Sequence, residues 1–377
     1  MMEVPLLSLK KLYAEQRDEI NAAIARVVES QVFIQGPEVL GLESEVEAFL
    51  GGGAHAIGCG SGSDAIVLAL KALGVGPGDE VITPVHSFTS TATSVDIVGA
   101  TPVFVDVEEH SLNLDPRLLA AALTDATKAV VAVHLFGRCA DVHAVRRELD
   151  SAGRQDVLII EDAAQSLGAR LRGEAACTIG ALATTSFFPT KNLGAFGDGG
   201  MCFAKSEVHA SDLRALRAHG AREKYKAEMI GFNSRLDSLQ AAVLRVKLPA
   251  LDRWSASRRR SAARYHELFG SAGLQGFVTC PPAHDDEFEH IYNQFNLRVS
   301  RRDELQAFLQ SKGVGTAVYY PRTLAQQPCY SGRGFDDVQF PIATAAAADS
   351  LAIPVAPGTS AEAQHYVVAQ IAAFYGV

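Results

Sequence analysis

The sequence predicts an α/β protein whose large domain has a mostly parallel sheet between helices, followed by a smaller α+β domain. Three observations support this prediction. Between Ala54 and Phe203, short β-rich runs alternate with helical patterns, which is typical of parallel strands covered by helices on both faces. The chain has 377 residues, enough for two domains. After Phe203 the pattern first becomes helical and then changes to a mixture of helices and strands.

Seven runs are expected to form the strands of the large sheet, because each is short, largely apolar and flanked by turn-forming residues. In chain order they read AHAIGC, DEVITP, TPVFVDV, AVVAVHLF, DVLIIEDA, ATTSFF and GGMCFA. The helices between them are well marked. The stretch SDAIVLALKALG begins at a Ser-Asp cap and stops at Gly74, whereas LDPRLLAAAL has Asp115 as its cap and Pro116 in its first turn.

The remainder of the chain predicts a second domain. Three helical segments come first, SDLRALRAHG, SRLDSLQAAVLRVKL and DRWSASRRRSAARYHELFG. Strand-like YNQFNLRVS and GTAVYYP then bracket a helix RRDELQAFLQSKG, and the end AEAQHYVVAQIAAFY is helical. We place the boundary inside the long charged helix, which gives a large domain over residues 1–255, including an N-terminal helical segment, and a small domain over residues 256–377.

Composition excludes several classes of protein. The apolar fraction of 48% and the charged fraction of 20% are ordinary for a globular chain, and the net charge of -9 disfavours nucleic acid as a partner. No apolar run reaches the roughly 18 residues that span a membrane. The six cysteines form no CxxC pair and the eleven histidines no HExxH, so neither a metal nor a disulfide framework is expected. The early charges differ from a signal peptide, so the expected location is the cytoplasm.

Lys191 is the first candidate for chemistry. It lies in TTSFFPTKNLGAFGDGG, and its neighbours from Ala175 to Thr190 and from Asn192 to Gly197 are all uncharged. Such surroundings disfavour the ammonium form and lower the pKa of a lysine, which is what an amine nucleophile requires. The alternative is an ordinary surface charge, the usual role of a lysine. We therefore expect a lysine that forms a Schiff base.

Four loops that follow strands can converge on this lysine, because ligands of open α/β sheets lie at the carboxyl ends of the strands. They read GSGSDA, VHSFTS, DAAQS and PTKN. The first is a glycine-rich turn that enters a helix, and free amides there, with the hydroxyls of Ser61 and Ser63, suit a phosphate. A plain tight turn and a degenerate dinucleotide loop are the alternatives. Ser63 stands where GxGxxG requires its third glycine, which disfavours the dinucleotide loop.

Asp162 and Phe88 complete the pattern. Asp162 follows a buried-strand pattern, and a carboxylate that faces a pyridine nitrogen keeps the ring protonated and makes it an electron sink. A helix cap or a salt bridge is the alternative for this residue. Phe88 lies in a Ser/Thr-rich loop after a strand, where it could stack on a flat cofactor ring or simply belong to the core.

Four sequence blocks carry a resemblance to a known family. They read DEVITPVHSFTSTATSV, EDAAQSLGA, SFFPTKNLGAFGDGG and GFNSRLDSLQAAVL, and they occur in order over nearly the whole chain. The chain resembles the nucleotide-sugar aminotransferases, which are pyridoxal-phosphate enzymes of fold type I with the aspartate aminotransferase architecture. The resemblance is closest to the branch that aminates carbon 3 of keto sugars carried on UDP or dTDP.

The resemblance implies a role for each matching residue. Lys191 would form the Schiff base with pyridoxal 5'-phosphate, Asp162 would bind the pyridine nitrogen, and Gln165 would contact the ring hydroxyl. Phe88 would stack on the ring. The implied phosphate contacts are Ser63, the amide of Asp64, Ser186 and, from a second subunit of a homodimer, Asn233. The implied contacts with the nucleotide sugar are Arg235, Tyr319 and Tyr320.

The resemblance also implies the reaction, a transamination from glutamate to a nucleotide-linked keto sugar. Relatives often read HYPxPLHxQP where this chain reads YYPRTLAQQP, so Tyr319 and Ala325 replace histidines and Arg322 is added. These departures bear on the sugar and leave the cofactor residues intact. The alternatives are amination at sugar carbon 4 or of a cyclitol, an NAD-dependent oxidoreductase, and a non-catalytic regulator that binds the cofactor.

Overall fold

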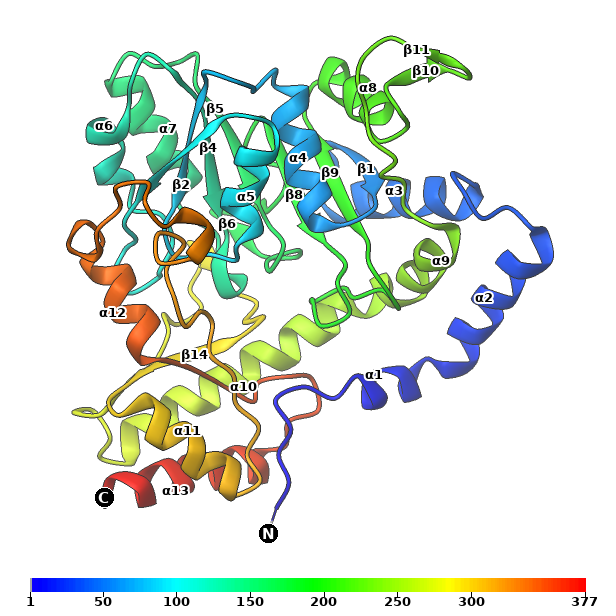
Figure 1. Cartoon of the computed structure of the whole chain (residues 1–377). Helices are drawn as coiled ribbons and strands as arrows, with labels where there is room; N and C mark the ends of the chain where they lie inside the picture. The colour runs from blue at the N-terminus through cyan, green and yellow to red at the C-terminus, as the bar shows by residue number, and fades with distance from the viewer. Residues whose placement is uncertain (1) are drawn as a thin grey trace.

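The computed structural model describes residues 2–377, and its central sheet confirms the predicted mostly parallel architecture (Figure 1). The strand order is β1-β9-β8-β5-β4-β2-β3. All seven predicted runs form these strands: β1 (His55–Cys59), β2 (Glu80–Pro84), β3 (Thr101–Val105), β4 (Thr127–Val133), β5 (Leu158–Asp162), β8 (Leu182–Ser186) and β9 (Gly200–Ala204). β9 runs antiparallel to β1 and β8, while the other pairs are parallel. The carboxyl ends of β4, β5 and β8 therefore lie side by side at one edge.

Helices cover both faces of the sheet. They are α3 (Pro37–Phe49), α4 (Gly62–Ala72), α5 (Ser90–Ile97), α6 (Leu119–Ala122), α7 (Val142–Ser151) and α8 (Glu207–Leu216). In α7 the buried residues Val142, Val145 and Leu149 recur at helical spacing, so one stripe faces the sheet and the rest faces solvent. In α4 every residue from Ala65 to Leu70 is buried, because the helix packs on β8 and β9 and is covered by α5 and α8.

Two helices lead from the sheet to the small domain. α9 (Ser238–Lys247) packs against α3 and α2 of its own chain, with Ala242 fully buried beside Ala23 and Val27. α10 (Leu251–Ser271) runs from the large core to the small one (Figure 1). Trp254, near its start, belongs to the large core, while Tyr265, near its end, belongs to the small core. The boundary at residue 255 stays a prediction, and it falls on a continuous helix.

The small domain has an antiparallel sheet under helices. Its strands are β12 (Val278–Thr279), β14 (Phe295–Val299) and β15 (Ser350–Ile353), and its helices are α11 (Arg302–Ser311), α12 (Pro341–Asp349) and α13 (Ala361–Tyr375). The N-terminal segment leads into α1 (Leu9–Glu15) and α2 (Arg17–Ser30). Val4 pairs with Val314 and packs in the small core, so the first residues contact the small domain rather than the large one.

Local differences from the sequence prediction are confined to short segments. GTAVYYP forms an isolated bridge between Ala317 and Ala352 rather than a strand, because the chain then turns into the cleft between the domains. β15 comes from a run that the sequence pattern did not single out. Short strands form two further sheets: β6 (Arg170–Leu171), β7 (Glu174–Ala175) and β13 (Phe288–Glu289), and the projecting hairpin of β10 (Ala221–Glu223) and β11 (Lys226–Ala227) (Figure 1). Among residues 2–377, no helix combines the length and apolarity needed to cross a membrane.

Candidate active site

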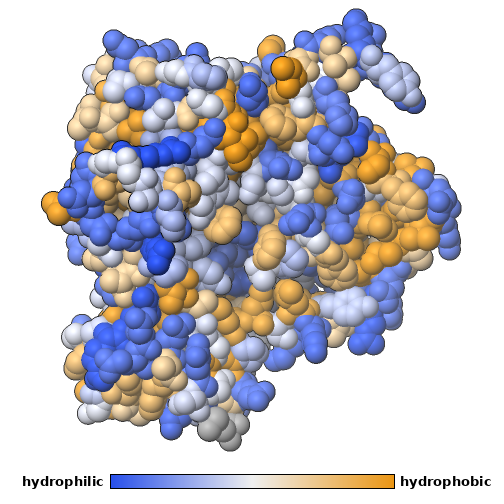
Figure 2. Space-filling model, viewed as in Figure 1, coloured by the Kyte–Doolittle hydropathy of each residue, from blue (hydrophilic) through white to orange (hydrophobic). Residues whose placement is uncertain are grey.

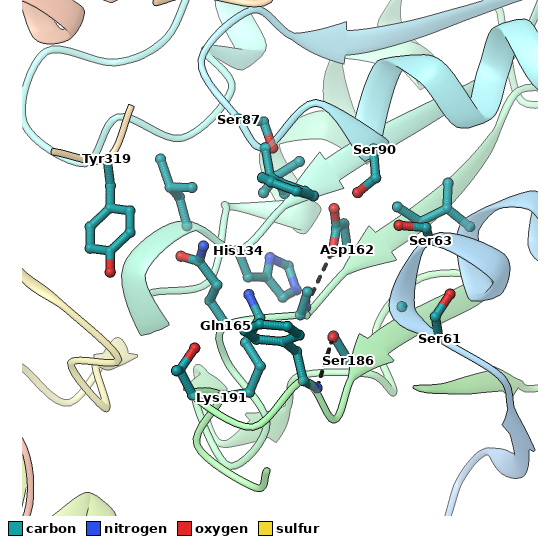
Figure 3. Close-up of a pocket in the computed structure, with 18 of the residues that line it drawn as sticks. Ser61, Ser63, Ser87, Ser90, His134, Asp162, Gln165, Ser186, Lys191 and Tyr319 are labelled. Carbon is teal, nitrogen blue, oxygen red and sulfur yellow. Dashed lines mark hydrogen bonds between the residues drawn. The ribbon is translucent and has the colours of Figure 1, made fainter. Parts of the chain in front are cut away.

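A cavity of about 420 Å³ lies at the carboxyl ends of β4, β5 and β8. The four loops that were expected to converge all contribute to its wall, and Tyr319 and Tyr320 close it from the small-domain side. Figure 3 shows Lys191, Gln165 and Asp162 around one space. The predicted site residues found in the wall are Ser63, Phe88, Asp162, Gln165, Ser186, Lys191, Tyr319 and Tyr320.

The turn that carries Lys191 is fixed by backbone hydrogen bonds. The amide of Lys191 donates to the carbonyl of Phe188 at 2.8 Å, and the amide of Ala195 donates to the carbonyl of Phe187 at 2.8 Å. Gly194 is required here, because a Cβ at this position would lie 2.3 Å from the carbonyl oxygen of Pro189. The rigid turn therefore presents the lysine side chain to the cavity.

Burial lowers the pKa of Lys191 below that of an ordinary lysine, and the charge of Asp162 opposes this shift without cancelling it. The lowered pKa that the uncharged neighbours predicted is thus explained by the burial of the lysine side chain. A lysine with a lowered pKa has more of its amine in the neutral form, and the neutral form is the one that attacks a carbonyl or accepts a proton.

Asp162 is the last residue of β5, and strand alternation separates it from Glu161. Glu161 points away from the cavity, is fully buried, and accepts a hydrogen bond at 2.8 Å from Nε2 of His134. Burial raises its pKa, but His134 and the amides of Ile179 and Gly180 outweigh this and hold the pKa below its usual value. Asp162 faces the cavity instead, so the two consecutive acids have separate tasks.

Hydrogen bonds fix the carboxylate of Asp162 on two sides. Its Oδ2 accepts from the hydroxyl of Thr91 at 3.0 Å, and its Oδ1 accepts from the amide of Ala164 at 3.2 Å. The backbone carbonyl of the same residue accepts from the amide of His134 at 2.9 Å. The alternative role of Asp162 as one half of a salt bridge finds no support among these contacts.

Gln165 is held with its amide group in one orientation. Its Oε1 accepts from the backbone amide of Phe136 at 2.7 Å, so its Nε2 is the end that lies 3.0 Å from the hydroxyl of Tyr320. Tyr320, which the resemblance placed against the nucleotide sugar, therefore also contacts a residue expected at the cofactor ring. Phe88 lies beside Tyr320, and the centroids of the two rings are 6.1 Å apart.

The glycine-rich turn forms the N-terminus of α4 at the opposite end of the cavity from Tyr319 (Figure 3). Ser61, rather than Ser63, caps the helix, because its hydroxyl accepts from the amide of Asp64 at 3.0 Å. A Cβ on Gly62 would lie 2.6 Å from Cβ of Ser186, so the glycine lets the two segments that were expected at the phosphate approach closely. Ser63 and Ser186 both line the cavity here, and the hydroxyl of Ser186 accepts from the amide of Phe188 at 3.2 Å.

Three predicted residues lie outside the cavity wall of this chain. The amide of Asp64, expected at the phosphate, is engaged by Ser61, and its carboxylate accepts from the hydroxyl of Ser234 at 2.7 Å. Asn233 and Arg235 contact each other, with Nη2 of Arg235 donating to Oδ1 of Asn233 at 2.5 Å. A role for Asn233 at the cavity would require a second subunit.

The sequence analysis did not single out Ser87, Thr91 or His134. Ser87 and His134 line the cavity, and Thr91 supports Asp162 from behind. A signal for His134 was available, since it lies near the carboxyl end of the predicted run AVVAVHLF, where ligands of such sheets gather. The role of Thr91 had no such signal, because it depends on which side of α5 faces β5.

The residues present fit pyridoxal phosphate. Phe88 is 55% exposed at the cavity rim, which excludes the core alternative for this side chain and leaves its ring available for stacking. Asp162 offers an acceptor to a pyridine nitrogen, Lys191 offers an amine, and the start of α4 offers hydroxyls and helix-terminal amides to a phosphate. The cavity thus has an aromatic wall, a carboxylate, an amine and an anion site in one connected space.

Comparisons with known proteins agree with this geometry. Residues 14–372 match the DegT/DnrJ/EryC1/StrS aminotransferase family. The chain is 45% identical over 99% of its length, and 99% of the relative's, to a Geobacillus stearothermophilus protein named pleiotropic regulatory protein. It is 43% identical, over 94% of its length and 91% of the relative's, to dTDP-3-amino-3,4,6-trideoxy-alpha-D-glucose transaminase from Streptomyces venezuelae.

A solved structure gives the same result for the fold. The crystal structure of S. venezuelae DesV in complex with a ketimine intermediate matches with a TM-score of 0.93 and 39% identity, and covers 99% of each chain. A ketimine joins the aminated cofactor to a keto substrate, and pyridoxal 5'-phosphate is the cofactor of such enzymes. From its family match and its close relatives in sequence and structure, the chain belongs to the DegT/DnrJ/EryC1/StrS aminotransferase family of pyridoxal-phosphate enzymes.

Proposed function

We propose that this enzyme transfers the amino group of glutamate to carbon 3 of a keto sugar carried on dTDP or UDP. The product would be an amino sugar for a polysaccharide, a lipopolysaccharide or a natural product. The observation that carries the proposal is the placement of Lys191 and Asp162 in one cavity, with the N-terminus of α4 at its end. The name of the S. venezuelae relative supports a 3-keto sugar on dTDP, and the four sequence blocks support the wider nucleotide-sugar class.

The side chains divide the chemical work. Bound pyridoxal phosphate supplies an electron sink that stabilises negative charge at the reacting carbon. The carboxylate of Asp162 would accept a hydrogen bond from the pyridine nitrogen and keep it protonated. The Nζ atom of Lys191 would hold the cofactor covalently, would be freed when the amino donor binds, and would then move a proton from the donor's α carbon to the cofactor's reactive carbon. In the second half-reaction the same Nζ would take a proton from that cofactor carbon and give it to the sugar carbon.

The structure offers a reason for one lysine to perform both transfers. Burial keeps the pKa of Lys191 lowered, so its amine is available as a base, and its rigid turn holds Nζ on one side of the cavity. Phe88 and Tyr320 line the same cavity, with ring centroids 6.1 Å apart. These contacts support transfer on a single face of the substrate carbon.

We also propose a homodimer in which Asn233 of one chain completes the phosphate site of the other. Exposed apolar side chains gather between the end of α2 and α3, on the surface that is orange at the right of Figure 2. They are Val28, Val32, Phe33, Ile34 and Leu40. The apolar face of α9 packs within its own subunit, so this patch, rather than α9, supports an interface.

The six free cysteines support a reducing compartment, and we propose the cytoplasm as the location. The regulator alternative has a point in its favour, since one close relative is named as a regulatory protein. Lys191 distinguishes an aminotransferase from a regulator. An aminotransferase needs this lysine for proton transfer, whereas a regulator that only binds the cofactor does not. Amination at carbon 4 and of cyclitols remain the alternatives for the acceptor.

The deciding experiment mixes purified holoenzyme with glutamate and a panel of dTDP- and UDP-linked 3-keto and 4-keto sugars, and detects amino sugars by mass spectrometry. We expect product from a 3-keto acceptor. We expect Lys191→Ala to lose on the order of a hundred- to ten-thousand-fold in rate or more, and borohydride to fix the cofactor on Lys191 in the wild type. Cofactor binding without amination of any acceptor would favour the regulator.

The shared site is tested by subunit exchange. Lys191→Ala and Asn233→Ala are each expected to be inactive, but a heterodimer contains one composite site with both native residues. A random equimolar mixture should regain about a quarter of the wild-type rate, since half of the dimers are mixed and each has one intact site. No recovery after verified exchange, or a fully active monomer in sedimentation, contradicts the shared site.

A further inference from the structure

We propose that Thr91 is a positioning residue which, together with Ser87, sets the orientation of the Asp162 carboxylate toward the cofactor's pyridine nitrogen. The inference rests on the proposed cofactor site and deepens it. Thr91 lies near the start of α5, is fully buried, and is not part of the cavity wall. Any effect it has on the cofactor must therefore act through the residues that it contacts, Asp162 and Ser87.

Three side chains form a directed chain of hydrogen bonds. The hydroxyl of Thr91 lies 3.0 Å from Oδ2 of Asp162, and the hydroxyl of Ser87 lies 2.8 Å from that of Thr91. A carboxylate accepts hydrogen bonds and donates none, so the single proton of Thr91 goes to Asp162. Ser87 must then donate to Thr91. The order Ser87 to Thr91 to Asp162 follows from counting donors alone.

This chain leaves the carboxylate little freedom. Oδ2 is held by Thr91 and Oδ1 by the amide of Ala164, and Asp162 is only 5% exposed. The same residue lines the cavity. Hydrogen bonds that involve a charged group are stronger than neutral ones, and they weaken little where water is excluded. A fixed carboxylate can meet a ring nitrogen without reorganising when the cofactor binds.

The same short segment also carries the ring that would stack on the cofactor. Phe88 follows Ser87 directly, and Ser87 is 3% exposed while Phe88 is 55% exposed. The bond between Ser87 and Thr91 spans four residues and ties the base of the Phe88 loop to α5. Figure 3 shows Ser87 and Asp162 on the same side of the cavity. One segment thus holds both the stacking ring and the carboxylate beneath it.

The competing explanation is that Thr91 has a purely structural role, because buried hydroxyls near the start of a helix often only hydrogen-bond to neighbouring groups and stabilise the helix. The two explanations differ for conservative variants. Thr91→Val keeps the shape and removes the donor, whereas Thr91→Ser keeps the donor and removes a methyl group. A positioning role predicts that Thr91→Ser behaves like the wild type at the cofactor and Thr91→Val does not. A packing role predicts the reverse.

The experiment compares the wild type, Thr91→Val, Thr91→Ser and Ser87→Ala. Three quantities are measured: the dissociation constant of pyridoxal phosphate added to apoenzyme, the pH midpoint of the absorbance change of the lysine-bound cofactor, and the melting temperature of the apoenzyme. A protonated ring nitrogen withdraws electrons and lowers the pKa of the attached Schiff base. A misaligned Asp162 protonates the ring less, so the midpoint should rise.

For Thr91→Val we expect about tenfold weaker cofactor binding and a midpoint higher by roughly half a pH unit or more. Thr91→Ser should stay within about threefold of the wild type, and Ser87→Ala should fall between the two. An unchanged midpoint in Thr91→Val, or equal losses in Thr91→Val and Thr91→Ser that follow the melting temperature, would overturn the role of Thr91. Wild-type protein that shows no such absorbance overturns the cofactor site itself.

Discussion

The side-chain amide nitrogen of Gln165 lies 3.0 Å from the phenolic oxygen of Tyr320. This contact crosses from the sheet edge of the large domain to the segment that enters the cleft from the small domain. Burial raises the pKa of Tyr320, and Gln165 only partly offsets the shift, so the phenol stays neutral and can accept from the amide. The segment from the small domain therefore contacts Gln165, the residue expected at the cofactor ring, as well as lining the part of the cavity proposed for the sugar.

The first prediction follows from this contact. Tyr320→Phe removes the partner of Nε2 while Phe136 still holds Oε1 of Gln165, so the amide loses one of its two anchors. We expect a few-fold weaker affinity for pyridoxal phosphate, in line with the loss of about 1 kcal/mol for one hydrogen bond. Titration of apoenzyme followed by absorbance measures it. Tyr319→Phe is the matched control and should leave cofactor affinity unchanged; equal effects of both variants contradict the assignment.

The second prediction concerns the stability of the apoenzyme against pH. Burial lowers the pKa of Lys191 in the folded state, so between the folded and the unfolded pKa values the unfolded chain binds more protons. The resulting penalty is full below the folded pKa and disappears as pH rises through the unfolded value, about 10.4. Apo Lys191→Met should therefore melt higher than apo wild type at pH 7, with a gap that narrows toward pH 10. A gap that is constant with pH would show that only packing has changed.

The third prediction concerns the stability of the folded protein at low pH. His86 is fully buried, and burial lowers the pKa of its ring to about 4, because the nearby backbone of Tyr319 offsets only part of the shift and the charge of Arg298 adds to it. The centroid of its ring lies 6.1 Å from the centroid of the Tyr320 ring. Because the unfolded pKa is about 6.5, stability should fall as pH drops from about 6.5 to about 4, by roughly 3 kcal/mol in full.

Thermal melts from pH 7.5 to pH 4 test this, with His86→Gln against the exposed-site control His110→Gln. We expect a shallower acid slope for His86→Gln and an unchanged slope for His110→Gln. Other buried histidines, such as His290 with a pKa lowered to about 3, also contribute to the wild-type slope, so the difference between the variants is the informative quantity. Identical slopes for both variants would remove His86 from the explanation.

The fourth prediction addresses the phosphate end. A Cβ on Gly62 would lie 2.6 Å from Cβ of Ser186, so Gly62→Ala must push Ser186 away from the start of α4. Loss of one hydrogen bond to a charged phosphate costs about 1.5–3 kcal/mol, which corresponds to roughly 10- to 100-fold weaker cofactor binding. Titration of apoenzyme checks the affinity, and far-UV circular dichroism checks the fold.

Gly270→Ala is the control for that substitution. Gly270 lies in α10, where a Cβ would have no neighbouring atom within 4 Å, and alanine favours helix by about 0.5–1 kcal/mol over glycine. It should leave cofactor affinity unchanged and raise the melting temperature. Native affinity in Gly62→Ala would mean that Ser186 does not bind the phosphate.

Much of the fold was predictable because its signals are local. The seven strands of the large sheet each stand out as short apolar runs between turn residues, and the rule that ligands gather at carboxyl ends is enough to bring Ser63, Asp162 and Lys191 together. GTAVYYP failed as a strand because its geometry depends on docking in the interdomain cleft, where tertiary contacts outweigh β-propensity.

The sequence by itself determined the order of the strands and helices along the chain, the uncharged neighbours of Lys191 and the glycine-rich turn before α4. Each of these features depends only on residues that are close together in the sequence. Only the tertiary structure decided that Glu161 pairs with His134, that Thr91 and Ser87 support Asp162, and that Tyr320 meets Gln165. Residues 155 positions apart, as Gln165 and Tyr320 are, leave no local pattern. Their contact exists because packing of the two domains fixes the distance between them.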